Sequence, residues 1–228
     1  TLYRFTRTGQ PTSEQYLYSW PHGSGPADLT YDSDTGMLWV MNVGDYDNCI
    51  FEMDPHAGYT GRSICPFGTG FSVSQRGLAY DPDTDTFFAG GWNDNTIYRF
   101  DRSGNVVEQA YVGLAIAGLA YNPTNGHLWV TENGGANDLT LLDAKNGYAT
   151  LETWAVPGWV LYSGAGLEID CDGHLWVVDH QAHVVQELDV GEPGLISCQP
   201  PWITVSPGTG MLASGASQTI TVNVDATI

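Results

Sequence analysis

The feature that most constrains this chain is a pattern that occurs four times. Each copy begins with a short apolar strand, continues through a turn rich in Asp, Asn, Thr and Gly, and ends in a second apolar strand. The copies are residues 28–40, 77–89, 117–130 and 166–177. One leucine position recurs at Leu29, Leu78, Leu119 and Leu167, at intervals of 49, 41 and 48 residues. A self-similar unit of this length indicates a repeat architecture.

A third strand follows each copy and ends on an aspartate. These strands are 50–54, 97–101, 139–143 and 184–189. Several short antiparallel strands in each repeat are typical of a β-propeller blade. Composition agrees, because 228 residues with 28 Gly, 12 Pro, 12 Tyr and 8 Trp describe a turn-rich, aromatic chain. No stretch has sustained helical periodicity. The sequence therefore predicts an all-β fold.

The N-terminal residues look like the outer half of one further blade. Leu2-Tyr-Arg-Phe5 matches Ile97-Tyr-Arg-Phe100, and residues 15–20 supply a strand to pair with it. With four full repeats, at about 27–67, 76–112, 117–156 and 165–197, this half blade makes five blades the simplest ring. A piece of a six-bladed parent is the alternative. We assign residues 1–197 to the propeller.

Residues 198–228 have a different composition and alternate Thr with Val in short strands. Pro201-Trp-Ile-Thr-Val205, Ser217-Gln-Thr-Ile-Thr-Val222 and Asp225-Ala-Thr227 resemble the opening of a bacterial immunoglobulin-like module. A second interpretation is that this segment closes the propeller. The strand at residues 2–5 has an unpaired inner edge, and buried backbone groups need partners.

The repeats themselves resemble a known class of propeller. Gly126-His-Leu-Trp-Val130 and Gly173-His-Leu-Trp-Val177 are similar to the repeats of bacterial streptogramin-lyase-like and surface-repeat propellers. Such a propeller followed by an immunoglobulin-like module resembles the C-terminal regions of large secreted bacterial proteins, including subtilisin-like peptidases. The resemblance implies other domains of a larger parent chain as partners. Residues 210–215 only superficially suggest a peptidase serine motif, because no His stands at a meaningful spacing.

Charge excludes two classes of partner. The formal net charge is −19 with only seven Lys plus Arg, so neither nucleic acid nor an anionic lipid surface is expected to bind. The sequence has no transmembrane run, and no membrane insertion is expected. The four cysteines allow two local pairings, Cys49 with Cys65 and Cys171 with Cys198. Disulfides would place the protein in an oxidising compartment, and we expect it to be secreted.

Candidate ligand-binding residues lie in the loops that gather on one face of a propeller, after the second and fourth strands of each blade. Aromatic side chains mixed with Asp and Asn suit a glycan or a peptide. The candidates are Asp45, Tyr46, Asp47, Trp92, Asn93, Asp94, Asn137, Asp138, Trp159, Tyr162, His180 and His183. The alternative is that Asn, Asp and Gly only form the turns.

We expect a non-catalytic binding or spacer module with no catalytic residues and no cofactor. A propeller enzyme of the streptogramin-lyase or lactonase type is the alternative, and it would need acid and base groups that converge near the axis. His180 and His183 alone do not supply them. Calcium is a weaker hypothesis for the turns between the first two strands, where carboxylates occupy alternate positions. These residues are Asp32, Asp34, Asp81, Asp83 and Asp85.

Overall fold

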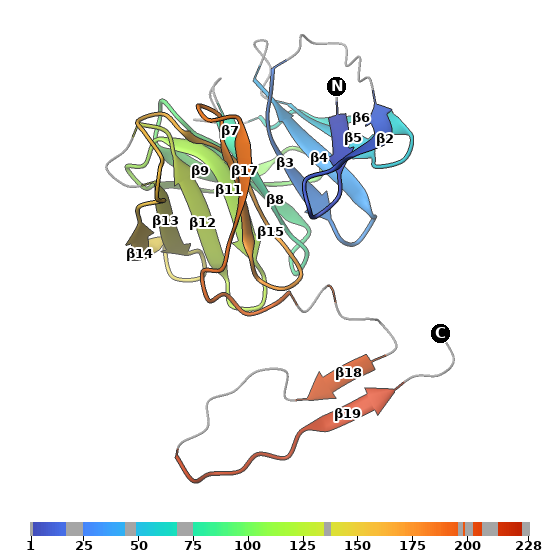
Figure 1. Ribbon diagram of the computed structural model, residues 1–228, viewed down its shortest axis with the longest axis vertical. Helices are drawn as coiled ribbons and strands as arrows, with labels where there is room; N and C mark the ends of the chain where they lie inside the picture. The colour runs from blue at the N-terminus through green and yellow to red at the C-terminus, as the bar shows by residue number, and fades with distance from the viewer. Residues whose placement is uncertain are drawn as a thin grey trace.

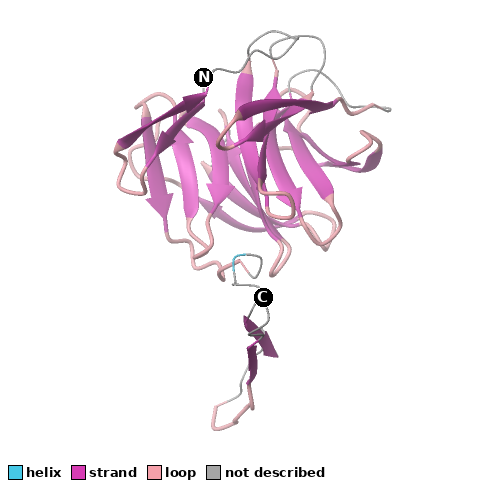
Figure 2. Ribbon diagram, turned by 90° about the vertical axis from the view of Figure 1, so that its right-hand side faces the viewer, coloured by secondary structure: helices cyan, strands magenta, loops and turns pink. Residues whose placement is uncertain are grey.

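The computed structural model describes residues 2–16, 25–43, 49–67, 75–134, 138–195, 198, 203–206 and 214–224. Antiparallel sheets surround a common axis in the arrangement of a β-propeller (Figures 1 and 2). The described residues contain no α-helix, and none of their segments is a helix long and apolar enough to span a bilayer. The predicted all-β propeller is confirmed.

The described residues form four blades, and the strands of each blade run outward from the axis in chain order. The first contains β3 (Pro26–Asp32), β4 (Met37–Asn42), β5 (Ile50–Asp54) and β6 (Gly58–Ile64). The second contains β7 (Gln75–Asp81), β8 (Thr86–Gly91), β9 (Thr96–Asp101) and β10 (Val106–Tyr111). The third contains β11 (Ile116–Asn122), β12 (His127–Glu132), β13 (Leu139–Asp143) and β14 (Ala149–Trp154). The fourth contains β15 (Gly164–Ile169), β16 (Leu175–Asp179) and β17 (Val184–Leu188).

The repeat in the sequence is a repeat in register. The recurring leucine lies opposite the same position of the second strand in every blade. The pairs are Leu29 with Val40, Leu78 with Ala89, Leu119 with Val130 and Leu167 with Val177. The four innermost strands contact one another in sequence, and β15 lies against β3 to complete the ring.

The core lies between the blades, where the second strand of one blade packs against the first two strands of the next blade. Trp39 is fully buried and meets Phe87 of the second blade edge to face, with ring centroids 5.3 Å apart. Trp129 packs against Leu167 and Ile169 of the fourth blade. The tryptophans are therefore packing wedges, as their place in the repeat predicts.

The N-terminal hairpin, β1 (Leu2–Phe5) with β2 (Pro11–Tyr16), lies between the fourth and first blades. Leu2 packs against the first blade, and the Arg7 guanidinium bonds to Asp170 and Asp172 of the fourth. The hairpin stays outside the ring of inner strands, because β15 and β3 already adjoin there. The half blade is present, and the count of five blades stays a prediction.

Both predicted disulfides are formed, Cys49 with Cys65 and Cys171 with Cys198. The repeat at residues 165–197 is long enough for four strands, but its described residues form three, β15, β16 and β17. The segment that follows β17 contacts the third blade instead. The Glu192 carboxylate reaches the third blade, where it accepts hydrogen bonds from the Trp129 indole N–H at 3.0 Å and the Asn125 amide at 2.7 Å. These hydrogen bonds connect the end of the last blade to the third blade.

The C-terminal segment forms a hairpin of β18 (Ile203–Ser206) and β19 (Thr221–Val224), which pair with each other (Figure 1). The side chains of β19 are exposed. Neither strand joins the sheet of β1 and β2. Closure of the propeller by this segment, and its assignment to an immunoglobulin-like module, both stay predictions.

Candidate ligand-binding site

The axis of the propeller is filled by one carboxylate. Asp28 on β3 is 6% exposed, and its Oδ2 accepts the backbone N–H of Leu78 at 3.0 Å and of Leu119 at 2.9 Å. Its Oδ1 accepts the N–H of Leu29 at 3.0 Å and of Leu167 at 3.2 Å. One side chain thus bonds the same backbone position in all four blades. Burial raises the pKa of Asp28 well above its ordinary value, although these hydrogen bonds oppose the shift.

Glycine occupies the Asp28 position in the other three repeats because the axis has no further room. A Cβ at Gly118 would lie 2.4 Å from the carbonyl oxygen of Ala165. A Cβ at Gly166 would lie 2.9 Å from Asp28 Oδ1. A bulge precedes the recurring leucine in each blade, and it frees the leucine N–H from the strand ladder. Asp28 and the four leucine N–H groups that it accepts therefore occupy the axis at this level.

A cavity of about 210 Å³ opens between the inner strands of the four blades, and its wall includes the residue before Asp28, which is Ala27. The cavity is lined by the residue that precedes Asp28 and by the residues that precede the three equivalent glycines. Three of these residues are alanines and the fourth is an arginine: Ala27, Arg76, Ala117 and Ala165. The residue that follows the second strand lines it in three blades. These are Trp92, Asn133 and His180. Small residues therefore hold the space open, and polar or aromatic groups surround it.

Arg76 is the dominant charge in the cavity. Its guanidinium carbon lies 4.5 Å from the centre of the Trp92 ring, a cation–π distance. Its Nε is buried and has no hydrogen-bond partner, and no carboxylate of the described residues forms an ion pair with it. Burial lowers the pKa of Arg76, but an arginine at any shift of this kind stays charged. By contrast, Arg4, Arg7, Arg62, Arg99 and Arg102 each pair with a carboxylate.

Asn133 lines the same cavity, and its side chain has an unused acceptor. The residue is 5% exposed, and its Nδ2 donates to the carbonyl oxygen of Gly164 at 2.8 Å. A carbonyl oxygen only accepts, so the neighbouring atom must be the amide nitrogen, and the other atom is Oδ1. That Oδ1 is buried with no partner. Buried polar atoms without a partner are rare and call for an explanation such as a ligand.

The candidate residues predicted from the sequence do not all meet at this cavity. Trp92 and His180 line it. Asp45, Tyr46, Asp47 and Asn137 lie outside the described residues. The others have local roles. Asp94 Oδ2 accepts the Tyr98 hydroxyl at 2.9 Å, and Asp138 Oδ2 accepts the Val156 N–H at 2.6 Å. Asn93 is an exposed turn residue.

Three further predicted residues belong to the fourth blade and its approach. The Trp159 indole N–H donates to Gln186 Oε1 at 2.7 Å, and Tyr162 lies against Gly134. His183 lines a different cavity, beside Arg7 of the N-terminal hairpin. His180 and His183 therefore do not form a pair. His180 Nδ1 lies 3.3 Å from the carbonyl oxygen of Ser163, and this contact requires the proton on Nδ1.

The carboxylates proposed as calcium ligands are occupied by protein groups. Asp32 Oδ1 accepts two turn N–H groups, and its Oδ2 accepts Arg102 Nη2 at 2.6 Å. Arg102 Nε also bonds Asp85, while Asp34 accepts the Tyr80 hydroxyl. In the second blade, Asp81 accepts Arg99 and the Asp83 backbone N–H. These hydrogen bonds support turn formation, and calcium at these turns stays a prediction.

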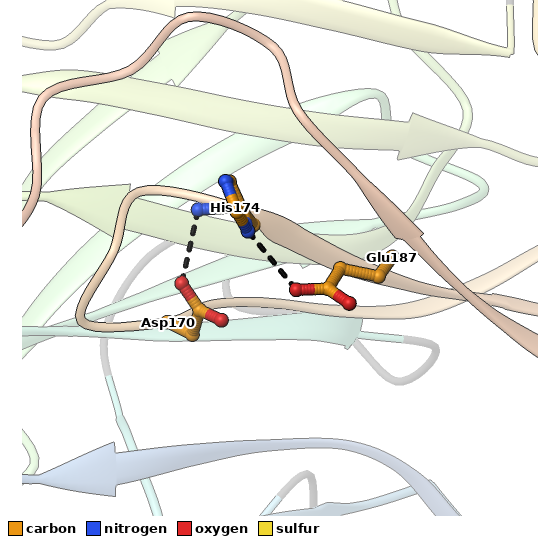
Figure 3. A group of neighbouring side chains, drawn as sticks. All are labelled: Asp170, His174 and Glu187. Carbon is orange, nitrogen blue, oxygen red and sulfur yellow. Dashed lines mark hydrogen bonds and ion pairs between the residues drawn. The ribbon is translucent and has the colours of Figure 1, made fainter. Parts of the chain in front are cut away.

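One other cluster has the composition of a metal site. Asp170, His174 and Glu187 bring ligand atoms within 4.8 Å of one another (Figure 3). Arg7 of the hairpin forms ion pairs with the two carboxylates, with Nη2 2.8 Å from Asp170 Oδ2 and 3.3 Å from Glu187 Oε1. Glu187 also lies 2.9 Å from His174 Nδ1, and it raises the pKa of that imidazole. The cluster fastens the hairpin to the fourth blade.

A second cavity, of about 400 Å³, lies between the hairpin and the strands β3 and β15. It is largely apolar, with Leu2, Val40 and Leu167 in its wall and Glu168 at its edge. Burial raises the pKa of Glu168 to about 7. Its carboxylate accepts backbone N–H groups, from Tyr31 at 3.3 Å and from Ile169 at 3.0 Å. We call this region the closing seam, because the last blade meets the first blade there.

No family model matches the sequence, and no curated protein matches it. Solved structures match the fold. A structure of streptogramin B lyase matches with a TM-score of 0.53 at 19% identity, over 78% of this chain and 56% of that one. Virginiamycin B lyase from Staphylococcus aureus matches with a TM-score of 0.50 at 18% identity, over 84% and 63%. A protein of unknown function from Bacteroides caccae matches with a TM-score of 0.57 at 16% identity, over 83% and 71%.

Identities this low show the fold alone. The chain spans little more than half the length of the streptogramin B lyase it matches. The predicted resemblance to propellers of that type is thus confirmed at the level of fold. Arg76 and Asn133 belong to the loops expected on this face, but neither was among the candidate residues, and Asp28 was not considered as a site residue. Aligning the four repeats distinguishes Asp28 and Arg76, because Ala-Gly, the pair in two copies, becomes Ala-Asp at residues 27–28 and Arg-Gly at residues 76–77.

Proposed function

We propose that this propeller is a non-catalytic binding module, and that the end of a glycan or a peptide enters the axial cavity. The observation that carries the proposal is a pair of groups that no described residue satisfies: an arginine without a carboxylate and a buried amide oxygen without a donor, both on residues that line the cavity. Such groups cost stability unless a ligand satisfies them. Their place at the centre of the loop face is where propellers commonly bind ligands.

The lining supports binding over chemistry. General acid–base catalysis needs titratable groups that converge on one reacting atom. Among the described lining residues, His180 is the one histidine, and its Nδ1 is engaged by the Ser163 carbonyl. We further propose that the protein is secreted, which two disulfides favour, and that residues 198–228 open a separate immunoglobulin-like module of a larger chain.

The test is binding of the purified chain to glycan and peptide arrays. We expect hits that Trp92→Ala abolishes, because this change removes the aromatic face that positions Arg76. Tyr111→Ala is the matched control, since Tyr111 is 77% exposed on β10 and does not line the cavity. Both variants should keep the wild-type melting temperature within a few degrees. Binding that Trp92→Ala leaves unchanged would contradict this site. Turnover of a lactone or macrocyclic ester would overturn the non-catalytic role.

A further inference from the structure

We infer that the axial cavity recognises a carboxylate-bearing sugar, a uronic acid residue at the end of a glycan chain. This inference rests on the proposed binding function and names its ligand class. The first step is charge. In a chain of net charge −19, Arg76 is the arginine that no described carboxylate neutralises, and it lines a cavity whose other described lining residues carry no carboxylate. A guanidinium with a free Nε–H is suited to a carboxylate, which accepts two parallel hydrogen bonds from it.

The second step is the neighbouring acceptor. Asn133 Oδ1 is buried without a donor, so the ligand must bring an O–H or N–H group as well as a carboxylate. A carboxylate alone would leave that oxygen unsatisfied. A uronic acid carries both groups on one ring, because hydroxyls flank its carboxylate. His180 lines the same cavity, but both of its ring nitrogens have protein partners: Nδ1 lies 3.3 Å from the Ser163 carbonyl oxygen and Nε2 lies 3.2 Å from the Gln181 side-chain amide.

The third step is size and access. A cavity of about 210 Å³ has room for one sugar ring and excludes an internal stretch of a chain. The overall negative charge also works against polyanions, whose other carboxylates would be repelled by the surface. A single acidic residue at a chain end fits both limits.

A peptide C-terminus would also bring a carboxylate, but the cavity is a poor receptor for an extended chain. Peptides usually dock by adding to an open strand edge, where backbone hydrogen bonds supply affinity. Here the ligand meets the ends of four inner strands. Their N–H groups are already used at the axis, where Asp28 accepts four of them. We therefore favour the sugar.

The experiment compares matched small probes by calorimetry with the full chain. Methyl β-D-glucuronide and methyl β-D-galacturonide present the carboxylate, methyl β-D-glucoside replaces it with a neutral group, and an N-acetylated dipeptide presents a peptide C-terminus. We expect at least one uronide to bind at least tenfold more tightly than the glucoside and the dipeptide. Arg76→Gln and Asn133→Asp should each abolish the preference, the first by removing the cation and the second by placing a negative charge against the ligand.

Arg4→Gln is the control, because Arg4 pairs with Glu14 on the exposed hairpin. It should leave all affinities unchanged. Arg76→Lys keeps the charge but loses the planar pair of donors, and it should retain part of the preference. Binding of the glucoside as tightly as the uronides, still lost in Trp92→Ala, would overturn the inference and leave the proposed function standing. Preferential binding of the dipeptide would overturn the sugar assignment. Arrays and probes that all fail to bind would remove the proposed function as well.

Discussion

Asp28 stands where the other three repeats have glycine, and this single difference decides how the centre of the molecule is filled. Three glycines leave room at the axis for one side chain, and a carboxylate with two oxygens accepts the four leucine N–H groups that point there. Buried N–H groups need acceptors, since an unsatisfied one costs about 1–3 kcal/mol. The buried carboxyl group of Asp28 is tolerated because both of its oxygens accept hydrogen bonds.

At this scale we predict that Asp28→Ala lowers the free energy of unfolding by about 4 kcal/mol or more, because four buried N–H groups lose their acceptor at once. Asp28→Asn keeps one accepting oxygen and should cost about half as much. Urea denaturation measures both. Asp143→Ala is the control, because Asp143 caps only a surface turn through the Lys145 N–H and should cost about 1 kcal/mol. A loss for Asp28→Ala no larger than for Asp143→Ala would contradict the axial role.

The turns between the first and second strands show how blades are joined. In the first blade, the buried Asp32 receives the Trp39 indole N–H and the guanidinium of Arg102, which comes from the second blade. In the second blade, Phe88 replaces the tryptophan and has no N–H, and Arg99 bonds Asp81 instead. Burial alone would raise the pKa of Asp32, but its hydrogen bonds and Arg102 leave that pKa lowered.

At the element scale we predict that Arg102→Ala costs about 3 kcal/mol, because it leaves a fully buried carboxylate without its cation. The exposed pair of Arg4 and Glu14 provides the comparison. Arg4→Ala should cost less than about 1 kcal/mol, since its side chain is 55% exposed and water screens the pair. Chemical unfolding of both variants tests this, and equal effects would show that Arg102 is no more than a surface charge.

At the scale of the whole molecule, the ring depends on the closing seam. Glu168 of the last blade bonds the Tyr31 N–H of the first blade at the edge of a largely apolar cavity. Burial raises the pKa of this carboxyl to about 7, so the folded protein holds a proton that the unfolded chain releases near its ordinary pKa of 4.5. Stability contributed by the protonated form is therefore present in acid and is lost as the pH rises toward 7.

We predict that the free energy of unfolding falls by on the order of 2 kcal/mol between pH 5 and pH 8. Glu168→Gln should remove the part of this fall that Glu168 contributes, because the amide carries no charge to desolvate. Asp28 and Glu132, whose pKa values are also raised by burial, should keep their own contributions of the same sign. The carboxylates with lowered pKa, such as Asp32 and Asp170, titrate below this window and do not mask it. Urea unfolding at several pH values is the measurement. A variant with the wild-type pH dependence would show that Glu168 is not the group responsible.

The sequence by itself determined the blades. Strand alternation, Asp and Gly turns and the recurring leucine are local signals, and each blade forms from consecutive residues, so repeat, strand order and both disulfides were predictable. The ring was not. The half blade predicted at residues 2–20 suggested five blades, but whether β15 meets β3 depends on packing between segments about 140 residues apart. The site was not predictable for the same reason. Arg76, Asn133 and Asp28 come from separate blades and converge only when the inner strands close around one axis.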